Sequence, residues 1–285
     1  MAGNVIRAIL NISSYRNTNL KTYASKSLNR INAVGEQLEF YIKDALASSF
    51  VLSQDKKESA YSETFSWSGN QNHPPDIILN NGDAFEIKKI ESANSSLALN
   101  SSPPKNKLLV DDVRITADCK RCDGGAWKEK DLFYVIGNVN GGIIKYLFFV
   151  HGDCYAADHK VYEKVHEPIK KEIGSVLDSL GLEKGETVEL GKVRRVDPLG
   201  ITELRIRGMW SIDNPLSVFR NFCQLEDNAF HLFLIVQNEK YLSYPKADIQ
   251  ELESSKVVSV KDILIKNPNN PAKLLEAKFI RFVLL

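Results

Sequence analysis

The sequence predicts an α/β protein in which helices cover one central mixed β-sheet. Helical periodicity marks the first 48 residues, and two pairs of apolar strands bracket turn sequences at 80–82 and 140–142. Strands and helices then alternate irregularly, which favours a mixed sheet. We expect one domain over residues 1–285, with a candidate recognition subdomain at 183–285. A chain of 285 residues can bury its core without disulfide or metal staples.

Two helices are expected at the N-terminal end, at about 4–12 and 29–48. In the second, apolar residues recur at helical spacing, and acids and a lysine occupy the other face. The apolar set is Ile31, Val34, Leu38, Tyr41, Ile42, Ala45 and Leu46. The polar stretch at 53–62 that follows predicts a loop.

The signal then changes from helices to strands. A short strand is expected at 64–67, and a hairpin at 76–90 turns at Asn80-Asn81-Gly82, because Asn and Gly tolerate positive φ. Residues 92–107 are rich in Ser, Asn and Pro and predict a loop. A second hairpin, at 132–150, turns at 140–142.

The second half of the chain predicts two helices and four strands. One helix is expected at 158–180, interrupted by Pro168 and ended by Gly181. The other follows the capping pair Asn214-Pro215 to about residue 225. The expected strands are 188–196, 202–210, 230–236 and 278–285.

Composition and charge exclude several classes of protein. The net charge of +1 argues against a protein that coats nucleic acid non-specifically, so a polyanion would have to meet a local basic patch. No apolar run approaches the roughly 20 residues that span a bilayer, and no secretory signal is evident. Four cysteines in a chain of this length do not form a disulfide framework, and the cytoplasm is the expected compartment.

The residues that carry chemistry lie on the hairpin at 76–90. Because strand side chains alternate, Glu86 and Lys88 face the same way, and the turn brings Asp76 beside them. Two carboxylates suit Mg²⁺, which prefers oxygen ligands, lowers the pKa of bound water and stabilises charge on a phosphate. A neighbouring lysine can orient the attacking water. These groups are the parts that phosphodiester hydrolysis needs; a surface hairpin with scattered charges is the alternative.

The spacing Pro75-Asp76, nine residues, then Glu86-Ile87-Lys88 resembles the PD-(D/E)xK nuclease motif. Longer strings at 68–76, 95–102, 152–158 and 195–202 resemble the NgoPII-type type II restriction endonucleases. The resemblance covers about residues 4–210. It implies a restriction-endonuclease-like core with the active site at one sheet edge.

The resemblance also implies roles for individual residues. Asp76, Glu86 and the carbonyl of Ile87 would hold Mg²⁺, and Lys88 would assist the water that attacks phosphorus. Glu36, on the second helix, matches a glutamate that helps hold metal in many enzymes of the superfamily; an ordinary solvated acid is the alternative.

The implied activity is cleavage of double-stranded DNA at a short, palindromic, G·C-rich site, with GGCC as the best guess from the family. A palindrome read by one polypeptide implies a homodimer. The host would carry a DNA methyltransferase of matching specificity, without required contact. The alternatives are a structure-specific nuclease of repair or recombination, and a non-catalytic DNA-binding module.

Two further groups of residues are candidates for binding. Basic side chains near 194–207 could present guanidinium groups to guanine, and the loop at 92–107 could touch DNA; these candidates are Arg194, Arg195, Arg205, Arg207, Ser101 and Lys105. A CxxC pair and a later His/Cys pair offer four zinc ligands, Cys119, Cys122, His151 and Cys154. Reduced cysteines packed in the core are the favoured interpretation, so little zinc is expected.

Overall fold

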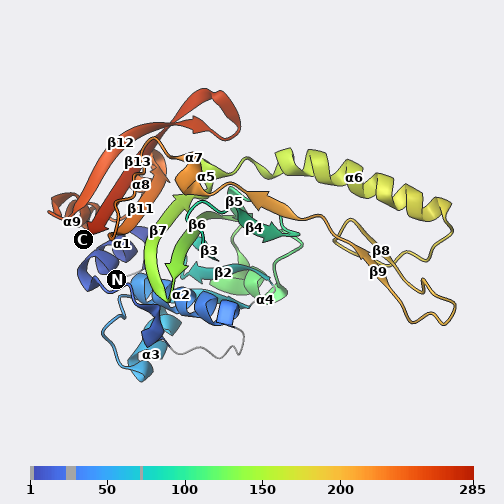
Figure 1. The fold of residues 1–285 in the computed structure, drawn as a ribbon, viewed down its shortest axis with the longest axis horizontal. Helices are drawn as coiled ribbons and strands as arrows, with labels where there is room; N and C mark the ends of the chain where they lie inside the picture. The colour runs from blue at the N-terminus through green and yellow to red at the C-terminus, as the bar shows by residue number, and fades with distance from the viewer. Residues whose placement is uncertain (1–2, 24–29, 71–72) are drawn as a thin grey trace.

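The computed structural model describes residues 3–23, 30–70 and 73–285, and it confirms the predicted α/β class (Figure 1). A central sheet has the strand order β1-β2-β3-β6-β7-β11-β13-β12, and β5 pairs with β6 beside this path. The β3–β6 and β7–β11 pairs are parallel and the other neighbours are antiparallel, so the sheet is mixed. Its strands are β1 (Phe65–Asn70), β2 (His73–Leu79), β3 (Ala84–Ile90), β5 (Lys107–Leu109), β6 (Glu129–Asn140), β7 (Ile143–His151), β11 (Phe230–Gln237), β12 (Val258–Asn267) and β13 (Asn270–Leu284).

Both faces of this sheet are covered, which explains why its central strands are almost continuously apolar. Along β3 and β6, Phe85 and Phe133 enter one core, and Ala84 and Tyr134 enter the other. The first core also contains residues of α1 (Val5–Tyr15), α2 (Arg30–Ala47), α8 (Asn238–Leu242) and α9 (Lys246–Ser254). The second contains residues of α4 (Ala117–Arg121), α5 (Gly152–Tyr155), α7 (Pro215–Val218) and β4 (Leu97–Asn100), which pairs with β10 (Trp210–Ile212).

Helix α2 lies close to the sheet because a glycine faces it. A Cβ atom on Gly137 of β6 would lie 2.6 Å from a methyl carbon of Leu38, so only glycine permits this approach. Leu38 is fully buried in the first core. The contact brings the middle of α2 over β6, the strand next to β3.

An arm projects from the body of the molecule (Figure 1). It consists of α6 (His159–Ser179) and a hairpin of β8 (Gly191–Val193) and β9 (Leu204–Ile206). A helix of 21 residues is about 30 Å long. Apolar side chains join the hairpin to the helix, since a Cβ on Gly191 would meet Ile173, Leu177 and Ile206 at 3.0–3.3 Å. Residues 183–285, the candidate recognition subdomain, are therefore divided: the hairpin belongs to the arm, whereas β11, β12 and β13 belong to the central sheet.

The structure corrects several predicted elements. In the predicted loop at 53–62, residues 54–62 belong to α3 (Gln54–Thr64), whose polar sequence has no apolar periodicity. This helix is held by tertiary contacts, because Lys57 and Tyr61 both bond the buried carboxylate of Asp44. Helix α6 continues through Pro168, where the prediction of an interruption was wrong. Pro168 is exposed, so water can satisfy the carbonyl that loses its helical N–H partner.

Other predicted boundaries also change. The loop at 92–107 contains β4 and the first residue of β5, and the helix after Asn214 ends at Val218 rather than near 225. The strands at 188–196 and 202–210 shorten to β8 and β9, whereas the C-terminal strand lengthens to β13. Asn29, the predicted start of the second helix, lies outside the described residues. Two short 3-10 helices, η1 (Leu20–Thr22) and η2 (Cys122–Gly125), complete the elements. In the part of the chain that the structure describes, no helix is long and apolar enough to cross a membrane.

Candidate active site

The predicted hairpin of β2 and β3 opens at the residues that were expected to carry chemistry. The two strands pair at Ile77–Phe85 and Ile78–Ala84. At the residue before Ile77, an oxygen of the Asp76 carboxylate accepts a hydrogen bond of 2.6 Å from the backbone N–H of Ile87. The side chain of Asp76 therefore satisfies a donor of β3 that would otherwise face a strand partner. This bond fixes Asp76 next to Glu86 and Lys88.

Glu86 and Lys88 leave β3 on the same side, as strand alternation predicts. The Lys88 ammonium lies 2.6 Å from a carboxylate oxygen of Glu86, and both side chains are largely buried. Between and beside them, Phe85 and Ile87 pack into the first core. The three charged residues Asp76, Glu86 and Lys88 thus meet at the opening between β2 and β3.

Electrostatics favour a cation at this opening. Burial and the neighbouring Glu86 raise the pKa of Asp76 to about 8, although Lys88 and the Ile87 N–H act in the opposite direction. Burial alone would lower the pKa of Lys88, but the two carboxylates raise it, so the ammonium stays charged. One ammonium does not fully compensate two buried carboxylates. A divalent ion with a preference for oxygen ligands fits this donor set and would relieve their repulsion.

The conformation of β2 around Asp76 depends on contacts from β1. The indole N–H of Trp67 donates a hydrogen bond of 3.1 Å to the carbonyl of Pro75. Across from it, a Cβ on Gly69 would lie 2.4 Å from the same carbonyl oxygen, so β1 can approach Pro75 only with glycine at this position. These contacts hold the Pro75-Asp76 step against the sheet.

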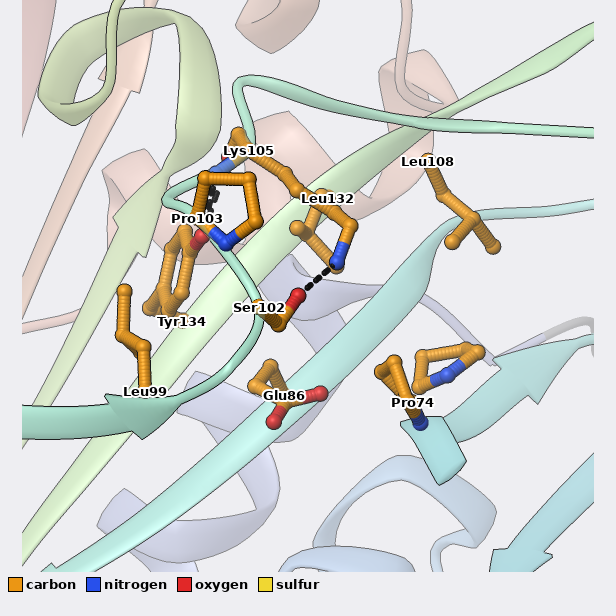
Figure 2. Close-up of a pocket in the computed structure, with 10 residues that line it drawn as sticks. Pro74, Glu86, Leu99, Ser102, Pro103, Lys105, Leu108, Leu132 and Tyr134 are labelled. Atoms are coloured by element: carbon orange, nitrogen blue, oxygen red, sulfur yellow. Dashed lines mark hydrogen bonds between the residues drawn. The ribbon is translucent and has the colours of Figure 1, made fainter. Parts of the chain in front are cut away.

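A small cavity of about 20 Å³ lies beside Glu86, and Lys105 lines its other side (Figure 2). This volume has room for about one water molecule. Lys105 was predicted to touch DNA from a surface loop, but its ammonium turns inward to Ser102 and lies 3.3 Å from Asp112. Burial lowers the pKa of Lys105. Tyr134 also lines the cavity, and it holds this loop by accepting a hydrogen bond of 2.8 Å from the Lys105 N–H.

Helix α2 contributes a second acid besides the predicted one. Glu36 is half-buried on this helix. Glu39, one turn later, lies close enough to Asp76 to raise its pKa, and it forms an ion pair of 2.7 Å with Lys43. Sequence reasoning missed Glu39, although its spacing from Glu36 places both acids on neighbouring positions of one helix face.

The predicted DNA-contacting arginines lie on the arm, apart from the hairpin with Asp76. Arg194 and Arg195 are exposed in the loop after β8, and Arg195 lies 3.6 Å from Glu183. Arg205 and Arg207 extend from and just beyond β9 on one face, as predicted, and both bond Glu189. Ser101 lies in the body of the molecule, exposed in the turn after β4, and the next residue, Ser102, lines the cavity beside Glu86.

The structure does not bring the four predicted zinc ligands together. Cys119, Cys122 and Cys154 are buried free thiols, and burial raises the pKa of each, which disfavours the thiolate that zinc binds. Within residues 3–23, 30–70 and 73–285, the group whose ligand atoms all lie within 4.8 Å of one another is Asp131, His151 and Asp153.

The carboxylates of this second group are already paired with lysines. Lys107 lies 2.7 Å from Asp131 and 3.3 Å from Asp153, and Lys240 lies 2.8 Å from the other oxygen of Asp131. His151 contributes a further contact of 3.3 Å to Asp131. Lys240 also pairs with Asp83 at 2.5 Å, so these residues belong to an ion-pair network that joins β5, β6, β7 and α8.

Comparisons with known proteins identify the family of this chain. The family model described as NgoPII restriction endonuclease matches residues 3–266. The chain is 43% identical over 282 residues to a curated protein named type II restriction enzyme NgoPII, from Neisseria gonorrhoeae, and the match covers 98% of this chain and 99% of that protein. No solved structure matches the chain.

Proposed function

Because the chain belongs to the NgoPII restriction endonuclease family, we propose that it is a Mg²⁺-dependent type II restriction endonuclease that hydrolyses phosphodiester bonds in double-stranded DNA. The observation that carries the mechanism is the meeting of Asp76, Glu86 and Lys88 where β2 and β3 separate. Paired oxygen donors beside a charged lysine are what metal-assisted phosphodiester hydrolysis requires.

Asp76, Glu86 and the carbonyl of Ile87 would hold the Mg²⁺ ion. Glu36 on α2 would be a further ligand, and Glu39 on the same helix lies close enough to act on Asp76. When bound, the ion would supply a more acidic water and stabilise charge on the phosphate. The Ile87 N–H orients Asp76, and Glu86 keeps the Lys88 ammonium beside the opening. Lys88 would orient the attacking water and stabilise the negative charge that grows on phosphorus. In-line attack would leave 5′-phosphate and 3′-hydroxyl ends.

The arm would place its arginines on the DNA while the opening in the body meets the scissile phosphate. Arg205 and Arg207 would contact bases, and Arg194, Arg195 and Ser101 would contact DNA elsewhere. Lys105 lines the same cavity as Glu86, so it would add positive charge behind the scissile phosphate rather than a contact on the outer surface. A short palindromic G·C-rich site, with GGCC as the best guess, would be read by a homodimer that supplies one active site for each strand.

Two biological expectations follow from this activity. The enzyme would act in the cytoplasm, which suits its four free cysteines. The host would protect its own sites with a methyltransferase of matching specificity, which need not touch this chain.

Incubation of a phage genome with the protein tests the proposal. Discrete fragments are expected with Mg²⁺ and none with EDTA. Lys88→Ala should reduce the cleavage rate by about 100-fold or more while DNA binding persists, on the scale of positioned groups in proton transfer. Lys89→Ala is the matched control, because the adjacent Lys89 pairs with Glu91 and not with the acids of the opening. Equal loss in both variants, or cleavage without metal, would contradict the mechanism.

A further inference from the structure

Glu189 links the two arginines of β9 through one carboxylate. Arg205 donates from Nε to one oxygen at 3.0 Å and from Nη2 to the other at 2.7 Å. The Nε atom of Arg207 forms an ion pair with this second oxygen, also at 2.7 Å. The Glu189 side chain is 7% exposed, whereas Arg205 and Arg207 are 53% and 51% exposed. The acid is therefore covered by the arginines, which themselves remain open to a partner.

The edges used in these bonds decide what each guanidinium can still contact. A guanidinium has five N–H donors in a planar fork. Arg205 uses its side edge, Nε and Nη2, on Glu189, so its end edge, formed by Nη1 and Nη2, still carries parallel N–H groups. Arg207 uses Nε, and its two terminal nitrogens remain. Parallel N–H groups are what a bidentate contact with guanine O6 and N7 requires.

The backbone around Glu189 is fixed to the arm. Its own N–H donates to the hydroxyl of Thr187 at 3.0 Å, and the Thr187 carbonyl accepts from Lys170 of α6 at 3.3 Å. Two residues later, Gly191 packs against Ile173 and Leu177 of the same helix. Glu189 is thus held by α6 on one side and holds two long side chains on the other.

We infer that Glu189 is a positioning residue for sequence recognition: it fixes Arg205 and Arg207 side by side with their outer N–H edges directed at guanines. The inference rests on the proposed function and deepens it by naming a specificity determinant on the arm. A fixed pair loses less rotamer entropy on binding than two free arginines would. It also sets the spacing at which two bases are read.

Neutralising Glu189 would have the opposite effect on the affinity for the cognate duplex if this carboxylate merely repelled DNA phosphates. Neutralising a repulsive acid raises affinity for every duplex, whatever its sequence. Neutralising a positioning acid lowers affinity for the cognate duplex while non-specific affinity stays the same or rises. The ratio of cognate to non-cognate affinity therefore separates the two roles by sign.

The experiment begins with the wild-type protein, whose recognition site is read from the ends of a phage genome cut with Mg²⁺. Binding is then measured in EDTA to a duplex carrying that site and to the same duplex with one G·C pair changed to A·T. We expect Glu189→Gln to lower the affinity ratio about tenfold, the size of one lost bidentate contact. Glu203→Gln is the matched control, because Glu203 pairs with Lys192 on the same hairpin at 3.0 Å. It should leave the ratio unchanged.

A second variant pair tests whether Glu189 acts through the arginines. In an Arg205→Ala and Arg207→Ala background, Glu189→Gln should lower the ratio no further. Limited trypsin digestion of each free variant reports whether the arm is folded, and an arm in Glu189→Gln as resistant as wild type is expected. A ratio that stays at the wild-type value in Glu189→Gln, or an equal loss in Glu203→Gln, overturns the inference alone. Failure of the wild-type protein to cut DNA overturns the proposed function and this inference with it.

Discussion

Replacing Asp76 with asparagine should inactivate the enzyme and, in the absence of metal, stabilise it. Asparagine has nearly the same shape, and its carbonyl can still accept the hydrogen bond from the Ile87 N–H. The substitution removes one of two carboxylates that repel each other at the opening. Active sites often carry such destabilising groups, and their removal raises stability at the expense of activity.

The pKa of Asp76 sets the size and the pH range of this effect. Its ordinary value of about 4 rises to about 8 in the folded chain. Between these values the folded state holds a proton that the unfolded state has lost, so wild-type stability falls as pH rises through this window. From pH 6 to pH 8 the upper limit is about 2.7 kcal/mol, at about 1.4 kcal/mol for each pH unit. Lys88 offsets part of the repulsion on Asp76, so we expect about 1–2 kcal/mol.

Thermal unfolding in EDTA at pH 4, 6 and 8 measures the difference. The melting temperature of Asp76→Asn should lie a few degrees above that of wild type at pH 8 and above it by less at pH 6. The two melting temperatures should be equal at pH 4. The scale is about 2–4 °C for each 1 kcal/mol in a chain of this size. Added Mg²⁺ should stabilise wild type more than the variant. A variant that is less stable than wild type at pH 8, or a difference that does not change with pH, would refute the reasoning.

Asp131→Asn is the matched control with the opposite sign. Burial alone would raise the pKa of Asp131, but hydrogen bonds from His151, Lys107 and Lys240 hold it well below the ordinary value. Its stabilisation is therefore present at neutral pH and is lost as pH falls below about 4. Asp131→Asn should lower the melting temperature at pH 8, because it leaves Lys107 and Lys240 without their shared acid.

Three other predictions concern packing, metal content and specificity. Gly152→Ala should lower the unfolding free energy by about 1–3 kcal/mol in chemical denaturation, because its Cβ would lie 2.0 Å from the Asn106 carbonyl oxygen. Gly174→Ala on exposed α6 should be neutral or stabilising. Elemental analysis should find far less than one zinc per chain; stoichiometric zinc that disappears in Cys119→Ser would disprove this. Sequenced ends of digested DNA should share a G·C-rich palindrome, GGCC being our best guess, and a common site of A·T pairs alone would exclude guanine recognition by Arg205 and Arg207.

The hairpin that carries Asp76, Glu86 and Lys88 could be predicted from local sequence, because strand alternation and an Asn-Gly turn act over a few residues. The inward direction of the Lys105 side chain could not be predicted in this way. Its ammonium faces inward because Ser102 and Asp112 bind it, and Asp112 lies beyond β5. Glu39 was missed for a similar reason: its distance from Asp76 depends on the packing of α2 on the sheet, which the Leu38–Gly137 contact sets.

Secondary structure without an apolar pattern was also beyond local reasoning. Helix α3 buries no residue, and long-range bonds to Asp44 hold it in place. The helix and both strands of the arm were predicted, but their packing into one arm was not, because its core is small and is formed by residues far apart in the sequence. Leu177 of α6 and Val193 of β8 are buried only because the chain folds back along the helix.

The arm leaves the body and returns to it at nearly the same place. The ring of Tyr162, in the first turn of α6, lies 5.7 Å from the ring of Trp210, where β10 rejoins the body by pairing with β4. A short linker could therefore replace the segment between them without stretching the chain. Evolution could exchange arms of different length and base contacts while the catalytic hairpin stays unchanged, and protein engineers could graft new arms at the same two positions.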